Sequence, residues 1–151
     1  MSVFDQTGNS LHWHTTNIDV DPMFVQDPNA GPDGSWEGVE DDFGDLHLLT
    51  GSPCIDAGDP NYVPVQNEKD MDGQQRVIGC RVDIGADEFV YLGDIEPDGD
   101  VDFMDFAIFA GRWYDTTCGE CAGADLTGDG IVDAYDLAKL AENWLKSLCH
   151  D

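Results

Sequence analysis

The sequence predicts a mixed fold in which an all-β part, residues 1–90, precedes a small all-α module, residues 91–151. Three observations carry this prediction. The first part holds short apolar runs between clusters of turn residues. The second part contains an acidic pattern of 12 residues that is written twice, and an apolar stripe with helical spacing follows each copy.

Residues 1–90 contain six of the seven prolines, with many Gly, Asp and Asn residues around them. Short apolar runs bounded by such turn residues indicate β-strands. The runs are Leu11–Trp13, Met23–Val25, Leu46–Leu49, Arg76–Ile78 and Arg81–Ile84. No hairpin spacing separates them, so stacked parallel coils are favoured over a meander.

Four sequence segments make the predicted β fold more specific. They are NIDVDPMFV at 17–25, LHLLTGSPCIDAG at 46–58, DMDGQQR at 70–76 and VDIGADEF at 82–89. Over about residues 15–90 they resemble the last coils of right-handed parallel β-helix proteins. The resemblance implies a fold similar to that of polysaccharide lyases and surface adhesins, with any catalytic face of the parent protein on coils further upstream.

The acidic pattern reads DIEPDGDVDFMD at 94–105 and DLTGDGIVDAYD at 125–136. A calcium loop of the EF-hand type takes oxygen ligands from positions 1, 3, 5, 7, 9 and 12 and has glycine at position 6. In the first copy these ligand positions are Asp94, Glu96, Asp98, the Asp100 carbonyl, Asp102 and Asp105. In the second they are Asp125, Thr127, Asp129, the Ile131 carbonyl, Asp133 and Asp136. Two calcium ions are therefore predicted.

Each loop is followed by apolar residues at i, i+3, i+4 and i+7, which predicts an amphipathic helix. They are Phe106, Phe109, Ala110 and Trp113 after the first loop, and Leu137, Leu140, Ala141 and Trp144 after the second. Every position of the second copy lies 31 residues after its counterpart, as position 125 does after 94. Two such repeats can cover each other's apolar face. The β-branched residues at loop position 8, Val101 and Val132, are expected to pair with each other beneath the ions.

No entering helix is predicted before either loop, and position 12 is Asp rather than Glu. This half-hand pattern, over about residues 91–148, resembles the type I dockerin family of calcium-binding docking modules from secreted polysaccharide-degrading systems. The resemblance implies that the positions named above bind calcium. It also implies that loop positions 10 and 11 contact a cohesin-like partner; these are Phe103, Met104, Ala134 and Tyr135.

The overall charge and the N-terminus limit the function further. A formal net charge of −26 argues against nucleic acid or an anionic membrane surface as partner. No apolar stretch approaches the roughly 18 residues of a membrane span. The first residues lack the features of a signal peptide. Because dockerin-like modules are exported, we expect an extracellular or cell-surface fragment of a longer protein.

Other candidate sites are weaker. Of five cysteines, Cys54 and Cys80 lie one β-helix turn apart and are candidates for a disulfide, as is Cys149 with Cys118 or Cys121. A zinc site from Cys118, Cys121, Cys149 and His150, or one on His12 and His14, is less favoured. The segment Asp70–Arg76 begins with two acids spaced as at the start of a calcium loop. It is expected to be a turn, with Arg76 paired to an acid.

The sequence therefore favours a non-catalytic, calcium-dependent docking module, with no catalytic residue assigned in this chain. Three alternatives stay open. The chain is the tail of a polysaccharide-degrading hydrolase or lyase, an intramolecular cap that buries Phe103, Met104 and Tyr135 against residues 40–90, or a calcium sensor. Sensors open a groove between the helices of complete hands, and this chain lacks the entering helices.

Overall fold

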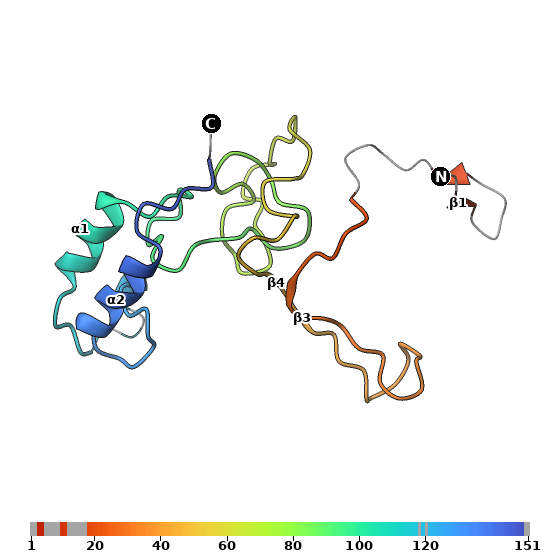
Figure 1. Ribbon diagram of the computed structural model, residues 1–151, viewed down its shortest axis with the longest axis horizontal. Coiled ribbons are helices and arrows are strands. Elements are labelled where there is room, and N and C mark those ends of the chain that lie inside the picture. The colour runs from red at the N-terminus through yellow and green to blue at the C-terminus, as the bar shows by residue number, and fades with distance from the viewer. Residues whose placement is uncertain (1–2, 5–9, 12–17, 118, 120, 150–151) are drawn as a thin grey trace.

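The computed structural model describes residues 3–4, 10–11, 18–117, 119 and 121–149. Its elements are β1 (Val3–Phe4), β2 (Ser10–Leu11), β3 (Phe24–Gln26), β4 (Asp45–Leu48), α1 (Phe103–Gly111), the 3₁₀ turn η1 (Cys121–Gly123) and α2 (Ala134–Glu142). A loop-rich body lies between the helical unit and the hairpin of β3 and β4, which projects away from it (Figure 1).

The strands overturn the predicted parallel β-helix, and His12–Trp13 of the first expected run lie outside the described residues. β1 pairs with β2, and β3 with β4, in both cases antiparallel. The hairpin register joins Phe24 to Leu48, and an isolated bridge between Asn29 and Asp42 extends it. The connection between β3 and β4 is much longer than the two to five residues that mark a hairpin in a sequence. The expectation of stacked coils is therefore wrong.

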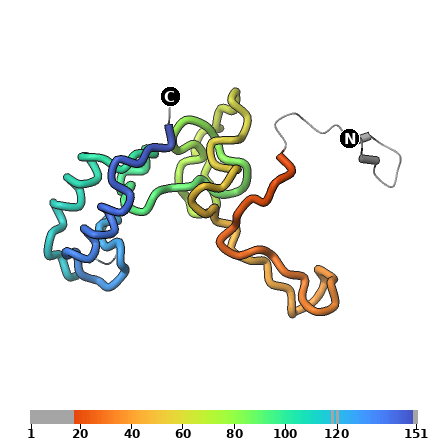
Figure 2. Tube along the Cα trace, viewed as in Figure 1, coloured from red at the N-terminus to blue at the C-terminus, as the bar shows by residue number. Residues whose placement is uncertain are grey.

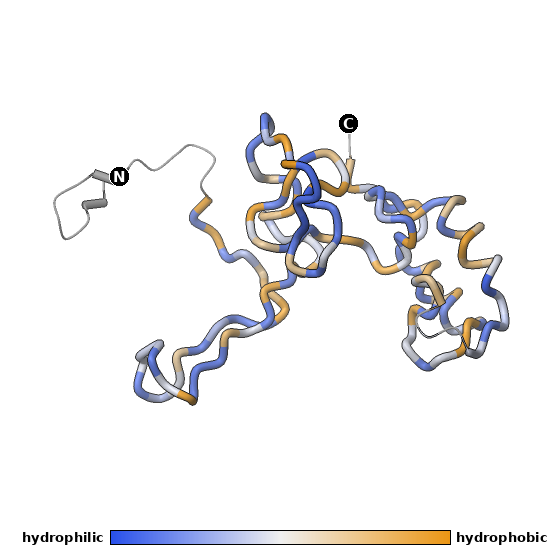
Figure 3. The backbone as a smooth tube through the Cα atoms, turned by 180° about the vertical axis from the view of Figure 1, so that it is seen from behind, coloured by the Kyte–Doolittle hydropathy of each residue, from blue (hydrophilic) through white to orange (hydrophobic). Residues whose placement is uncertain are grey.

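The segments Arg76–Ile78 and Arg81–Ile84 are not strands, because the carboxylates of the buried Glu88 and the half-buried Asp56 accept hydrogen bonds from three of their backbone N–H groups. Glu88 accepts hydrogen bonds from the N–H groups of Ile78 and Asp83, and Asp56 accepts one from Arg81 at 2.8 Å. Hydrophilic stretches accordingly run through the loop-rich body (Figure 3). Buried acids thus satisfy backbone donors that a sheet would otherwise pair.

The predicted helices are present, but the predicted all-α module is not. α1 and α2 have nine residues each, and the irregular segments that follow them make backbone hydrogen bonds to the acidic loops instead of forming further helices. The buried core of this unit consists of Val101, Phe109, Cys121, Ala124, Val132 and Leu140. A second cluster, Leu48, Cys54 and Phe89, lies in the loop-rich body. The chain is therefore neither the end of a β-helix nor an all-α module.

Tyr91 connects the two clusters by packing against both. Residues 143–149 run from α2 back to the loop-rich body (Figure 2). There Cys149 forms a disulfide with Cys80, across a sequence separation of 69 residues. Among the described residues, none of the helices is both long and apolar enough for a membrane span.

Candidate metal centre

The two acidic repeats fold into the same local structure. In the first loop, the Asp94 carboxylate accepts hydrogen bonds from the N–H groups of Asp98 at 3.3 Å and Gly99 at 2.9 Å. In the second, Asp125 accepts them from Asp129 at 3.2 Å and Gly130 at 2.8 Å. These bonds wrap each loop around its first carboxylate. The φ angles of Gly99 and Gly130 are +95° and +87°, so both glycines make the sharp turn predicted at position 6.

The end of each loop is also the start of a helix. Asp102 and Asp133, at loop position 9, accept hydrogen bonds from Met104 and Tyr135 and are the N-caps of α1 and α2. Three residues later, Asp105 and Asp136 each accept a hydrogen bond from the backbone N–H group of the N-cap residue, which completes a capping box in both repeats. The same acids thus define the loop and orient the helix.

The carboxylates at position 12 lie inside the loops. Asp105 accepts hydrogen bonds from the N–H groups of Ile95 at 2.7 Å and Glu96 at 3.2 Å, and Asp136 accepts one from Thr127 at 2.9 Å. Asp105 and Asp136 are only 1% and 0% exposed. Backbone N–H groups therefore hold both side chains against the opposite side of their loop.

The side chains at loop positions 3 and 5 are more accessible: Asp98, Thr127 and Asp129 are exposed, and Glu96 is half-buried. The side chains of Asp98 and Asp129 each accept a hydrogen bond from the residue two positions on, Asp100 at 3.0 Å and Ile131 at 2.9 Å. Both acids are exposed. They can therefore turn toward an ion without breaking a buried contact.

Val101 and Val132 do not pair with each other through any backbone hydrogen bond of the described residues. Val101 exchanges backbone hydrogen bonds with Leu145 and Lys146, which follow α2. Val132 exchanges them with Tyr114 and Asp115, which follow α1. Each loop is therefore closed by the tail of the other repeat's helix, which corrects the predicted pairing. The two valines are fully buried.

The charge balance of the loops suits a hard cation. Asp94, Asp105 and Asp136 are buried, and none of the ion pairs among the described residues involves a carboxylate of either loop. Burial raises the pKa of Asp94 to about 7, and the charges of Asp105 and Asp98 add to this effect. Buried carboxylates without a cationic partner are costly. An all-oxygen set of this kind fits calcium.

The pKa of Asp136 is lowered. Burial acts to raise it, but hydrogen bonds from the N–H groups of Asp133 and Thr127 outweigh that effect.

In the part of the chain that the structure describes, the loop carboxylates do not bring three ligand oxygens within 4.8 Å of one another. The loop carboxylates are therefore not gathered into a ligand set in this structure.

No entering helix precedes either loop in the part that the structure describes, as the sequence predicted. Residues 87–93 form no helix, and of the described residues just before the second loop only Cys121–Gly123 are helical, as the three-residue turn η1. No paired, complete hands are therefore present in the described part, and the geometry of a sensor groove is missing.

The predicted partner-binding residues begin the two helices and face solvent. Phe103, Met104 and Tyr135 are 73%, 55% and 72% exposed, and Ala134 is also exposed. Phe103 contacts Trp144 edge to face, with 5.1 Å between the ring centroids. An apolar groove of about 240 Å³ lies beside it, lined by Phe103, Phe106, Leu137, Leu140, Ala141 and Trp144.

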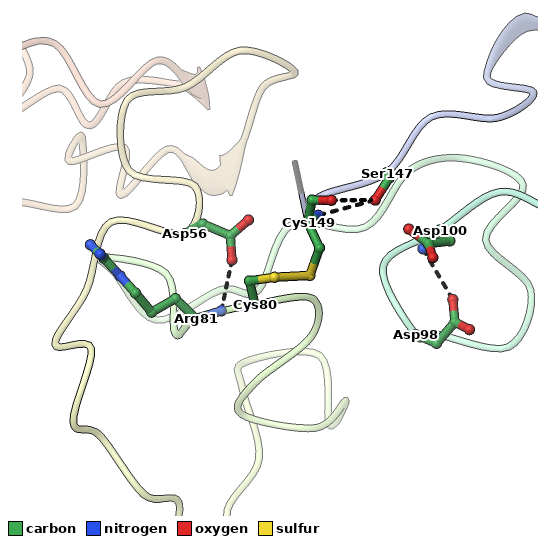
Figure 4. The surroundings of a disulfide bond; sticks show 7 residues. All are labelled: Asp56, Cys80, Arg81, Asp98, Asp100, Ser147 and Cys149. Carbon is green, nitrogen blue, oxygen red and sulfur yellow. Dashed lines mark hydrogen bonds between the residues drawn. A yellow bond between two sulfur atoms is a disulfide. The ribbon is translucent and has the colours of Figure 1, made fainter. Parts of the chain in front are cut away.

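The cysteines differ from the expected pairing. Cys80 is bonded to Cys149 (Figure 4), whereas Cys54 is a buried free thiol. The predicted pairs Cys54–Cys80 and Cys149 with Cys118 or Cys121 are therefore wrong, because antiparallel strands and loops replace the coils that would have stacked Cys54 on Cys80. Cys121 is itself disulfide-bonded. The sulfurs of Cys121 and Cys149 are consequently not zinc ligands, and His12, His14, Cys118 and His150 lie outside the described residues.

The predicted turn after Asp70 is confirmed. The Asp70 carboxylate accepts hydrogen bonds from the N–H groups of Asp72 at 3.0 Å and Gln74 at 2.7 Å. Arg76 forms an ion pair with Glu88, whose side chain is fully buried. Both observations agree with the sequence-based interpretation of this segment.

A group that the sequence did not indicate lies next to this turn. His47, Asp72 and Asp87 place one ligand atom each within 4.8 Å of one another. The carboxylates of Asp45 and Asp72 accept hydrogen bonds from the protonated His47 ring, which raises the pKa of His47 to about 9. The only signal in the sequence was the acidic turn at 70–74, since nothing in the spacing connects His47 with Asp87.

No protein-family model, curated protein or solved structure matches the chain.

Proposed function

We propose that the chain is a non-catalytic, calcium-dependent docking module of the dockerin type. Its two loops, Asp94–Asp105 and Asp125–Asp136, would bind one calcium ion each. The observation that carries the proposal is a set of five local structural features that recur at a spacing of 31 residues. They are the hydrogen bond accepted by the first carboxylate, the turn made by the position-5 carboxylate, the positive φ of the position-6 glycine, the N-cap and the capping box. Capping alone explains only the last two.

The module would attach its parent protein to a cohesin-like partner or a surface assembly, in a system that breaks down polysaccharide. The exposed Phe103, Met104 and Tyr135 support docking, since aromatic residues and methionine are enriched in protein interfaces. Their exposure disfavours the intramolecular cap, which requires them to be buried against residues 40–90. The disulfide Cys80–Cys149 supports an extracellular location, because such bonds persist in oxidising compartments.

Calcium would act as a structural ion. Without it the loop carboxylates repel one another at short range, and α1 and α2 lose part of the platform that orients them. An ion that binds only the folded chain stabilises it by mass action, by about 2.7 kcal/mol at a concentration 100-fold above its Kd. Docking would consequently require calcium.

Capture of a cohesin-like domain by the full chain tests this function. We expect binding in millimolar calcium and its loss in excess chelator. Met104→Asp and Tyr135→Asp should each abolish capture in calcium, because a charge in an apolar contact is costly. The matched control is Val39→Asp, at a fully exposed apolar position of the β3–β4 hairpin, which should leave capture unchanged. Capture that is unchanged in excess chelator would contradict the proposal.

A further inference from the structure

The side chains of His47, Asp72 and Asp87 come from three separate segments that the fold holds together. His47 lies in β4, Asp72 in the turn at 70–74, and Asp87 in the segment that follows. The Asp87 carboxylate accepts a hydrogen bond from the Leu48 N–H group at 3.1 Å, and the Met71 N–H group donates to the Ala86 carbonyl at 2.9 Å. The group is therefore fixed by the backbone around it.

The donor atoms suit a metal ion. The His47 Nε2 atom lies 3.1 Å from both carboxylate oxygens of Asp72, and one oxygen of the buried Asp87 completes a set within 4.8 Å. The other ring nitrogen, Nδ1, is hydrogen-bonded to Asp45. Metal-binding histidines commonly use their second nitrogen in this way, because the carboxylate fixes the ring orientation and the tautomer.

A second observation at the same place is independent of these acids. The Gln74 side-chain oxygen Oε1 is buried and accepts no hydrogen bond from the part of the chain that the structure describes. Gln74 lines the same cavity of about 150 Å³ as His47, Asp72 and Asp87. A buried oxygen without a donor is unfavourable. A small movement of the Gln74 side chain would open this oxygen to an ion, or to a water molecule bound to one, in the same cavity.

We infer that His47, Asp72 and Asp87 bind a first-row divalent transition-metal cation such as zinc. Asp45 is a positioning residue, and the Gln74 side-chain oxygen is a further ligand. Imidazole nitrogen selects such cations over calcium, which prefers oxygen ligands. Two carboxylates balance the charge of the ion. The cation would replace the proton that Nε2 shares with Asp72, and that proton would leave to solvent. The side chains of His47 and Asp72 are 36% and 43% exposed, which leaves an approach for the ion.

Zinc titration of the full chain by calorimetry tests this site, with calcium saturating in every arm so that the acidic loops do not compete. We expect one zinc ion per wild-type chain. Asp72→Asn and His47→Gln should abolish this binding, and Asp45→Asn should weaken it about tenfold or more. The matched control is Asp59→Asn, which removes an equally exposed carboxylate outside the group and should bind zinc as the wild type does.

Cobalt(II) absorption separates a ligand from a merely structural residue. His47→Gln should remove the visible absorption of bound cobalt in samples shown to be folded by circular dichroism, because it removes the nitrogen ligand. Asp72 is exposed, so Asp72→Asn should keep the fold, as measured by circular dichroism in chelator. The inference is overturned if the wild type binds no zinc, if Asp72→Asn and His47→Gln bind it unchanged, or if Asp59→Asn loses it equally.

Discussion

Gly99 of the first loop packs directly against Gly79 of the loop-rich body. A Cβ atom at Gly99 would lie 2.8 Å from the Gly79 Cα atom, whereas a Cβ atom at the equivalent Gly130 would meet nothing within 4 Å. Leu148 joins this contact by donating its N–H to the Gly99 carbonyl at 2.8 Å. The two loops thus have the same internal hydrogen bonds, but the first packs against the loop-rich body at Gly99, and the second has open space at Gly130.

This difference predicts unequal effects of the same substitution. Gly99→Ala and Gly130→Ala both place alanine at a positive φ, which costs about 1–2 kcal/mol. Only Gly99→Ala also forces two backbones apart, which adds about 1–3 kcal/mol. Urea unfolding in chelator, where ion binding does not contribute, measures both losses. Equal losses would contradict the packing of Gly99 on Gly79.

Removal of the Cys80–Cys149 disulfide should destabilise the chain. The bond closes a loop across 69 residues, and the chain-entropy argument assigns about 4 kcal/mol to a loop of that length. We expect Cys80→Ser with Cys149→Ser to lower the free energy of unfolding by several kcal/mol. Reductant should lower the stability of the wild type further than that of the double variant. A double variant as stable as the oxidised wild type would argue against this pairing.

The buried pair of Arg76 and Glu88 should matter far more than a surface pair. Arg76→Met leaves the Glu88 carboxylate buried without its cation, a change that costs about 3–5 kcal/mol. The matched control is Arg112→Met, which breaks the exposed Arg112–Asp115 pair at 3.6 Å and should cost less than about 1 kcal/mol. Chemical unfolding of both variants checks the ranking.

The buried acids predict a stability that falls as pH rises. Burial raises the pKa of Asp83 to about 6 and that of Glu88 to about 7. Between about pH 4 and pH 7 the folded chain therefore binds more protons than the unfolded chain, and the free energy of unfolding decreases with increasing pH. The slope for one such group is at most about 1.4 kcal/mol per pH unit.

Unfolding in urea at several pH values, with chelator present, measures this slope. Glu88→Gln should reduce the slope near pH 7 by the part that Glu88 contributes, and Asp94, whose pKa is also raised to about 7, should keep the rest. A stability that rises with pH through this range would contradict the burial of these acids as the dominant effect.

The sequence was sufficient for the features that depend on local spacing. The glycine turns at 99 and 130, the caps Asp102 and Asp133 and both helices follow from short-range patterns, and the structure contains them. The closure of each loop by the other repeat's tail could not be predicted, because a β-branched residue such as Val101 indicates an extended strand but not its neighbour.

The loop-rich body was predicted wrongly for a related reason. Short apolar runs indicate strands only if their backbone groups pair with one another, and here Glu88 and Asp56 take N–H groups of the expected strands. The proximity of His47 to Asp87 depends on long-range contacts of the same kind. Neither these contacts nor the metal-binding group could therefore be predicted without the fold.

The number of calcium ions bound by the full chain tests the central claim most directly. Native mass spectrometry with calorimetry should find two ions in the wild type and one in each of Asp98→Ala and Asp129→Ala. The control Asp33→Ala removes an exposed acid that makes the same kind of turn, with Ser35, and should retain two ions. A wild-type chain that binds no calcium at millimolar concentration, or single variants that still bind two ions, would contradict the account.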